Sequence, residues 1–180
     1  MTRINWQMWQ GAVSSEECDA LIKKLKDVPK EKGATYNDSN DIRKSNISWV
    51  ADPNIKLLLW QYAQQANRVA FGFDVTSVGD VQFTEYSAEY EGKYDWHHDV
   101  DWLGKNAFDR KISLVLQLSD SDSYEGCDFE FLEVQNPEPK ELKAKGTVIC
   151  FPSYISHRVT EITKGTRHSL VAWFEGPRWR

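Results

Sequence analysis

Hydrophobic positions follow two different periods along the chain, and the change lies near residue 77. In the first part, apolar residues recur at helical spacing after Ser14-Ser15-Glu16-Glu17, a capping-box sequence, which predicts an amphipathic helix ending near Pro29. Asp52-Pro53 predicts the start of a second helix, because an N-cap residue precedes a proline at the first helical position. The helix is expected to end at Gly72, and its buried stripe is expected to consist of Ile55, Leu58, Leu59, Tyr62, Ala66 and Val69.

From Val78 onward the period shortens to alternating runs separated by Gly, Asp, Ser and Pro, a pattern typical of an antiparallel β-sandwich or barrel. The clearest strand covers residues 112–118, where Ile112, Leu114, Leu116 and Leu118 share one side and Ser113, Val115 and Gln117 the other. Further strands are expected at 47–50, 81–86, 129–133, 146–151, 158–162 and 168–174. The pattern predicts a single domain over residues 1–180, mainly β with flanking helices: a helical part of about 1–77 packs outside a jelly-roll core of about 78–175.

Composition narrows the range of partners and compartments. The chain of 180 residues has 22 Lys+Arg against 27 Asp+Glu, a net charge of −5, and no basic cluster, which argues against nucleic acid as a partner. The sequence contains neither an apolar run long enough for a membrane helix nor an apolar N-terminal leader, so we expect a cytoplasmic protein. Cys18, Cys127 and Cys150 are widely spaced, which favours reduced packing residues over a disulfide framework or a zinc site.

The candidate chemistry lies in the β-rich part, which contains all four histidines. His97 and Asp99 form a His-x-Asp triplet at the end of an expected strand, and residues i and i+2 of a strand point to the same side. Such a pair is common by chance and is usually solvated. His157, delivered by another strand, adds a third candidate, and two histidines with one carboxylate are the ligand set of non-haem Fe(II) oxygenases.

Other motifs are distributed along the whole chain. In sequence order they are residues 13–18, Arg43-Lys44-Ser45, Trp49, Tyr86, Gly92, Tyr94, residues 110–114, 118–120 and 124–126, Phe151-Pro152, Arg167, Ser169 and Trp173. With the His-x-Asp triplet and His157, they resemble the 2-oxoglutarate- and Fe(II)-dependent oxygenases. Within that family the chain resembles the prolyl 4-hydroxylase-like group that includes the PKHD-type hydroxylases.

The resemblance implies a double-stranded β-helix core, cupin-like in architecture, that uses Fe(II), 2-oxoglutarate and O2, with ascorbate as reductant. By resemblance His97, Asp99 and His157 bind the metal and Arg167 pairs with the distal carboxylate of 2-oxoglutarate. Ser169, Tyr86 and Gln117 are the further cosubstrate-site candidates, although Gln117 stands where some relatives have a tyrosine that holds this carboxylate. The implied reaction hydroxylates a substrate C–H bond, with a prolyl residue of a peptide or protein as the expected target, and releases succinate and CO2.

Several alternatives remain open on sequence alone. The substrate could be a free amino acid or small molecule, and the core could be a decayed binding module, although that predicts a broken ligand set. A nucleic-acid demethylase shares the chemistry but conflicts with the acidic charge.

Individual residues also have alternative interpretations. His98 faces the opposite side of an extended strand from Asp99, so we expect a solvated or substrate-side residue there rather than a ligand. Asp101 is an alternative carboxylate ligand ranked below Asp99, and His168 is expected on the outer face of its strand. Four aromatic residues cluster around the triplet and belong either to the core or to a substrate groove: Tyr90, Tyr94, Trp96 and Trp102. The polar segments 30–46 and 100–109 are candidate lids.

Overall fold

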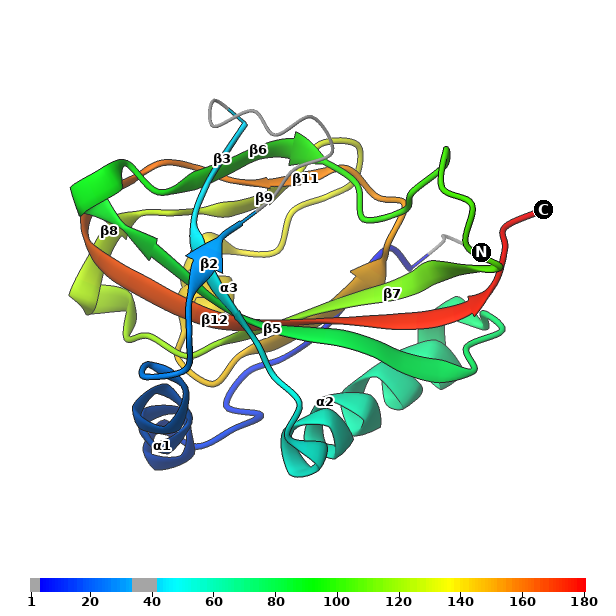
Figure 1. Cartoon of the computed structure of the whole chain (residues 1–180), viewed down its shortest axis with the longest axis horizontal. Coiled ribbons are helices and arrows are strands. Elements are labelled where there is room, and N and C mark those ends of the chain that lie inside the picture. Colours follow the sequence, from blue (N-terminus) through cyan, green and yellow to red (C-terminus); the bar gives the residue numbers. More distant parts are fainter. Residues whose placement is uncertain (1–3, 34–41) are drawn as a thin grey trace.

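Two antiparallel sheets face each other in the computed structural model, which describes residues 4–33 and 42–180 (Figure 1). The larger sheet has the strand order β1-β10-β7-β12-β5-β4-β2, with β8 paired to β12, and the smaller sheet has the order β3-β6-β11-β9. This arrangement confirms the predicted double-stranded β-helix core with helices outside.

The strands of the larger sheet are β1 (Gln7–Trp9), β2 (Glu31–Lys32), β4 (Asn46–Trp49), β5 (Ser77–Ser87), β7 (Phe108–Gln117), β8 (Tyr124–Gly126), β10 (Val148–Pro152) and β12 (Ile162–Pro177). Those of the smaller sheet are β3 (Arg43–Lys44), β6 (Lys93–His97), β9 (Phe129–Phe131) and β11 (His157–Val159). The helices are α1 (Ser15–Leu25), α2 (Pro53–Ala66) and α3 (Pro139–Lys143), with a π-helical turn at Asn67–Phe71 and short 3₁₀ turns at Ala88–Tyr90 and Ser121–Ser123.

The helices α1 and α2 begin where the sequence predicts and cover the face of the larger sheet that points away from the smaller one (Figure 1). At the start of α1 the Ser14 hydroxyl accepts a hydrogen bond from the Glu17 amide, and the Glu17 carboxylate accepts one from the Ser14 amide, which completes the capping box. Asp52 caps α2 by accepting from the amides of Asn54 and Ile55. Both helices therefore owe their start points to local side chains.

The predicted buried stripe of α2 holds for its first three turns and fails at its last position. Ile55, Leu59 and Ala66 are buried and Leu58 and Tyr62 are half-buried, whereas Val69 is 54% exposed. The amide of Gly72 bonds the carbonyl of Asn67, five residues back, so the wider π turn rotates the chain out of the 3.6-residue period. Gly72 ends the helix with a φ of 66°, as predicted.

Strand β7, which pairs with β10 on one side and β12 on the other, is buried on both faces. Ile112, Leu114, Leu116 and the adjoining Leu118 are fully buried against the helix-side core, which confirms the predicted alternation. On the other face Ser113 and Gln117 are also buried, because that face points into the space between the sheets. A strand face that contains polar residues in the sequence thus lines the interior of the molecule.

The remaining differences from prediction concern short elements. The predicted strand at 158–162 is divided, because β11 ends at Val159 in the smaller sheet and β12 begins at Ile162 in the larger one. β1, β2, β3, β8 and α3 were not predicted, and residues 34–41 of the first lid candidate lie outside the described residues. Within residues 4–33 and 42–180, no helix is long and apolar enough to span a membrane.

Candidate metal centre

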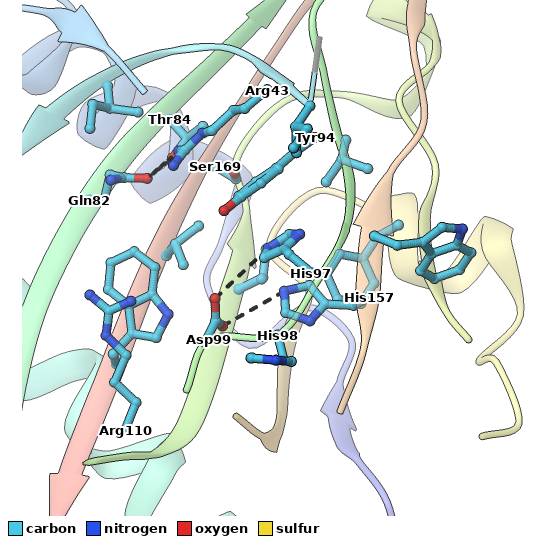
Figure 2. Close-up of a pocket in the computed structure, with 18 of the residues that line it drawn as sticks. Arg43, Gln82, Thr84, Tyr94, His97, His98, Asp99, Arg110, His157 and Ser169 are labelled. Carbon is cyan, nitrogen blue, oxygen red and sulfur yellow. Dashed lines mark hydrogen bonds and ion pairs between the residues drawn. The ribbon is translucent and has the colours of Figure 1, made fainter. Parts of the chain in front are cut away.

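A cavity of about 770 Å³ lies between the two sheets, and both sheets contribute to its walls. Figure 2 shows His97, Asp99 and His157 grouped in this cavity, with Arg43 and Arg110 at different parts of its wall. The strand pairing explains the grouping, because His157 on β11 lies directly opposite His97 on β6.

The three side chains form one compact donor set. His97 Nε2 lies 3.8 Å from Asp99 Oδ1, and His157 Nε2 lies 3.7 Å from Asp99 Oδ2. One ligand atom from each residue lies within 4.8 Å of the others. The structure therefore brings together the three residues that the sequence singles out, from two strands and the bend that follows one of them.

Backbone carbonyls fix the orientation of both imidazoles. His97 Nδ1 lies 2.7 Å from the Asp95 carbonyl oxygen, and His157 Nδ1 lies 2.9 Å from that of Ile155. Because a carbonyl accepts, each Nδ1 carries a proton and each Nε2 faces Asp99. Both rings thus present the nitrogen that a metal ion requires.

Two buried serines hold Asp99. The Ser113 hydroxyl donates to Asp99 Oδ2 at 2.5 Å, and the hydroxyls of Ser113 and Ser153 lie 2.9 Å apart. The Asp99 amide also donates to the Ser153 carbonyl at 2.9 Å. Sequence analysis missed both serines, because neither a serine on an alternating strand, such as Ser113, nor one in the turn after a strand, such as Ser153, gives a signal that distinguishes an interior position from a solvated one.

The electrostatics favour the charge states of a metal-binding site. Burial, reinforced by the neighbouring His157, lowers the pKa of His97 to about 3. Burial acts to raise the pKa of Asp99, but the charges of His157, His97 and Arg110 and the Ser113 hydrogen bond outweigh it and lower the pKa to about 2. At neutral pH the site thus holds an ionised carboxylate beside the neutral imidazole of His97.

This donor set fits Fe(II). Two imidazole nitrogens and one carboxylate oxygen are the 2-His-1-carboxylate set of non-haem iron sites, in which the remaining coordination positions stay open to other ligands. His98 and Asp101 lie at the cavity but outside the donor cluster, and His98 is exposed with its ring 6.0 Å from that of Trp102. The structure therefore groups His97 and Asp99, and not their neighbours, with His157.

The other predicted site residues come together on β12 and its neighbours. Arg167 and Ser169 are buried, line the cavity and lie opposite Tyr86 on β5 and Gln117 on β7, respectively. Arg167 Nε donates to Gln117 Oε1 at 2.8 Å. His168 points to the other side of β12, where its ring stacks on Phe83 and Nε2 lies 3.3 Å from Glu85.

The aromatic residues near the triplet divide between the two interpretations that the sequence left open. Tyr94 and Trp96 line the cavity, and the Tyr94 ring stacks on His97 with a centroid separation of 3.4 Å. Trp102 also lines the cavity and is 50% exposed. Tyr90 instead donates to the Glu85 carbonyl and is not among the residues that line this cavity.

Two further cavity residues carry hydrogen-bond donors that the sequence analysis did not assign. The Arg110 guanidinium lies over the Trp173 ring, 3.9 Å from its centroid. Trp173 Nε1 is buried, and it has no hydrogen-bond partner among residues 4–33 and 42–180. A buried donor without a partner in a cavity wall is costly unless a ligand satisfies it.

Comparison with solved structures shows the same fold in prolyl hydroxylases. A viral collagen prolyl hydroxylase from Paramecium bursaria Chlorella virus-1 has a TM-score of 0.73 at 17% identity, covering 96% of this chain and 97% of that one. A prolyl-4-hydroxylase of Pseudomonas putida has a TM-score of 0.71 at 19% identity, covering 97% and 94%. At this level of identity the likeness establishes the fold alone.

Sequence relatives are more similar over a shorter segment. A PKHD-type hydroxylase of Synechococcus sp. strain CC9311 is 35% identical over 94 residues, which cover 52% of this chain and 41% of that protein. A PKHD-type hydroxylase of Hyphomonas neptunium is 34% identical over 84 residues, 46% of this chain and 37% of that protein. The matched segments thus span less than half of these curated relatives.

The family comparison covers the part of the chain that holds the donor set. The family model of the 2OG-Fe(II) oxygenase superfamily matches residues 81–175, more than half of the 180 residues. His97, Asp99, His157 and Arg167 all lie inside this match. On this match the protein belongs to the 2OG-Fe(II) oxygenase superfamily, whose members use Fe(II), 2-oxoglutarate and O2.

Proposed function

We propose that this chain hydroxylates a prolyl residue in a peptide or protein and converts 2-oxoglutarate to succinate and CO2. In this proposal His97, Asp99 and His157 bind the iron, and Arg167 pairs with the distal carboxylate of 2-oxoglutarate. The observation that carries it is the compact donor set, with atoms within 4.8 Å of one another, in a cavity that also contains a buried arginine.

The bound iron would supply the activation of O2 that a C–H hydroxylation needs. The contribution of the chain is to bind and orient. Two carbonyl-anchored imidazoles and a serine-held carboxylate would hold the ion through three donor atoms. The guanidinium of Arg167 offers paired N–H groups to a carboxylate, while Ser169 and Tyr86 add hydroxyl groups to the same wall.

Donors beside the metal centre support a peptide as the substrate. Arg110 and Trp173 both line the cavity, and Arg110 is close enough to lower the pKa of Asp99 by its charge. A peptide carbonyl next to the target residue would accept hydrogen bonds from the guanidinium and from the unpaired indole N–H. The aromatic wall of Tyr94, Trp96 and Trp102 suits the apolar ring of proline.

The compartment and the reductant belong to the same proposal. Cys18, Cys127 and Cys150 are unpaired and buried, which suits the reducing cytoplasm. Ascorbate is proposed as the reductant on resemblance to the prolyl 4-hydroxylase-like group.

The test is a panel of proline-containing peptides, each paired with an otherwise identical peptide in which alanine replaces the proline. With Fe(II), 2-oxoglutarate and O2, we expect a mass gain of one oxygen atom on the proline peptides and one succinate per hydroxylation. Arg110→Ala should raise the KM for the peptide, while Arg68→Ala, on the far side of the molecule beside α2, serves as the control. Hydroxylation of free amino acids alone would show the peptide assignment to be wrong, and absence of succinate with any substrate would refute the oxygenase activity.

A further inference from the structure

A second cavity meets the first at Arg167. It has a volume of about 210 Å³, and its lining includes Gln117, Tyr124 and Cys127. Arg167 and Phe129 line both cavities, so the guanidinium lies at their junction. A ligand that extends from the metal centre to Arg167 would therefore place its far end beside the residues of the second cavity.

Hydrogen bonds at this junction fix the Gln117 amide in one orientation. Gln117 Oε1 accepts from Arg167 Nε at 2.8 Å, while Gln117 Nε2 donates to the Ser119 carbonyl and to the Tyr124 hydroxyl, each at 3.0 Å. With its oxygen and its amino group both engaged, Gln117 holds the arginine and has no donor left for a carboxylate. This geometry makes Gln117 a positioning residue for Arg167.

The Tyr124 hydroxyl has the opposite property. It accepts from Gln117, so its own hydrogen is free to be donated to a ligand. Burial raises the pKa of Tyr124, while the charge of the nearby Arg167 acts in the other direction, and the net shift is upward. The phenol thus keeps its proton at neutral pH and remains a donor.

Arg167 has terminal nitrogens left for a ligand at the same junction. Its Nη1 contacts the Cys127 sulfur at 3.9 Å, a long contact to a weak acceptor, and its Cζ lies 5.9 Å from the centre of the Tyr86 ring. Tyr124 and Cys127 belong to the same buried cluster, which keeps this corner of the protein dry. An anion here would meet a guanidinium and a phenol at low local polarity, where hydrogen bonds to charge are strong.

We propose that Tyr124 is the second anchor of the distal carboxylate of 2-oxoglutarate, donating its hydroxyl hydrogen to the carboxylate that Arg167 binds. This inference rests on the proposed function, because it takes Arg167 as the cosubstrate arginine. It assigns the role to β8, a strand that the sequence analysis did not connect with the cosubstrate. Gln117, placed in the cosubstrate site by the sequence analysis, acts here through Arg167.

The test compares Tyr124→Phe with Tyr62→Phe, which removes a phenol hydroxyl that donates to the Ala12 carbonyl beside α2. Binding to the Fe(II)-loaded proteins is measured by anaerobic calorimetry with 2-oxoglutarate and with 2-oxopentanoate, which has the same five carbons and no distal carboxylate. Loss of a hydrogen bond to a charged group predicts that Tyr124→Phe weakens 2-oxoglutarate binding by about 10-fold or more. The variant should bind 2-oxopentanoate as the wild type does, and Tyr62→Phe should match the wild type with both compounds.

Each contrary outcome has a distinct meaning. If Tyr124→Phe bound 2-oxoglutarate as tightly as the wild type, the assignment of Tyr124 would be wrong while the cosubstrate site stood. Equal weakening toward both compounds would show that Tyr124 merely packs, which also overturns the assignment. A wild-type protein that bound neither compound would overturn the proposed function and, with it, this inference.

Discussion

The hydrogen bond from Ser113 to Asp99 provides the sharpest test of how the fold prepares the metal centre. Ser113→Ala removes a hydroxyl that lies 2.5 Å from Asp99 Oδ2 and leaves the rest of a fully buried side chain in place. Without that donor, one carboxylate oxygen loses its fixed direction and the ionised form of Asp99 loses a source of stabilisation. We therefore expect Fe(II) affinity to fall.

The magnitude follows from the type of bond. A hydrogen bond to a charged group contributes about 1.5–3 kcal/mol, which corresponds to roughly 10-fold to 150-fold in a binding constant. Outer hydrogen-bond partners of metal ligands typically account for about 10-fold to 100-fold in affinity, which is the same range. We expect the Kd for Fe(II) to rise by about 10-fold to 100-fold.

The assay is anaerobic competition for Fe(II) between the protein and a chromogenic chelator. Ser48→Ala is the matched control, because Ser48 is equally buried but donates to the Val28 carbonyl outside the metal centre. Ser153→Ala should have a smaller effect, and the double variant should cost less than the sum, because Ser153 contacts Ser113. A Kd for Ser113→Ala within twofold of the wild type would refute the role of the serine pair.

Three further predictions concern the stability of the metal-free protein, measured by urea denaturation. Burial lowers the pKa of His97 from 6.5 to about 3, so the unfolded chain binds more protons than the folded chain between these two pH values. In this window the free energy of unfolding should fall on acidification by up to about 1.4 kcal/mol per pH unit, and His97→Gln should flatten the slope. Unchanged slopes would contradict that reasoning. Gly126→Ala should cost about 2 kcal/mol or more, because φ is +75° and the new Cβ would lie 2.3 Å from the Glu161 carbonyl oxygen; a loss below about 0.5 kcal/mol would refute it. Leu59→Ala, at a fully buried position of α2, should cost about 2–5 kcal/mol, and a smaller cost would show that the core relaxes around the site.

Local patterns in the sequence predict the helix starts and the strand alternation because their causes are local. Ser14 and Asp52 cap helices through atoms two or three residues away, and alternation on β7 reflects the pleat of one strand. The unexpected exposure of Val69 also has a local origin, but a π turn has no hydrophobic pattern from which it could be predicted. The predicted buried stripe of α2 is therefore wrong from the point where the helical period changes.

The candidate donor set could be predicted because its residues carry their chemistry in their type. An aspartate two residues from a histidine is visible in a sequence, whereas Ser113, Ser153 and Tyr124 become relevant only through strand register and contacts between strands. The register places Ser113 on the face that points between the sheets, next to a residue 14 positions earlier. No short-range pattern contains that information.

The most direct test of the central claim is anaerobic addition of Fe(II) and 2-oxoglutarate to the purified protein, followed by visible spectroscopy. The proposed site predicts a weak charge-transfer band in the wild type. His157→Ala should abolish the band, and Arg167→Ala should require a higher concentration of 2-oxoglutarate to reach it. A wild type without a band at saturating 2-oxoglutarate, or a band that persists in His157→Ala, would contradict the assignment of His97, Asp99 and His157 as the iron site.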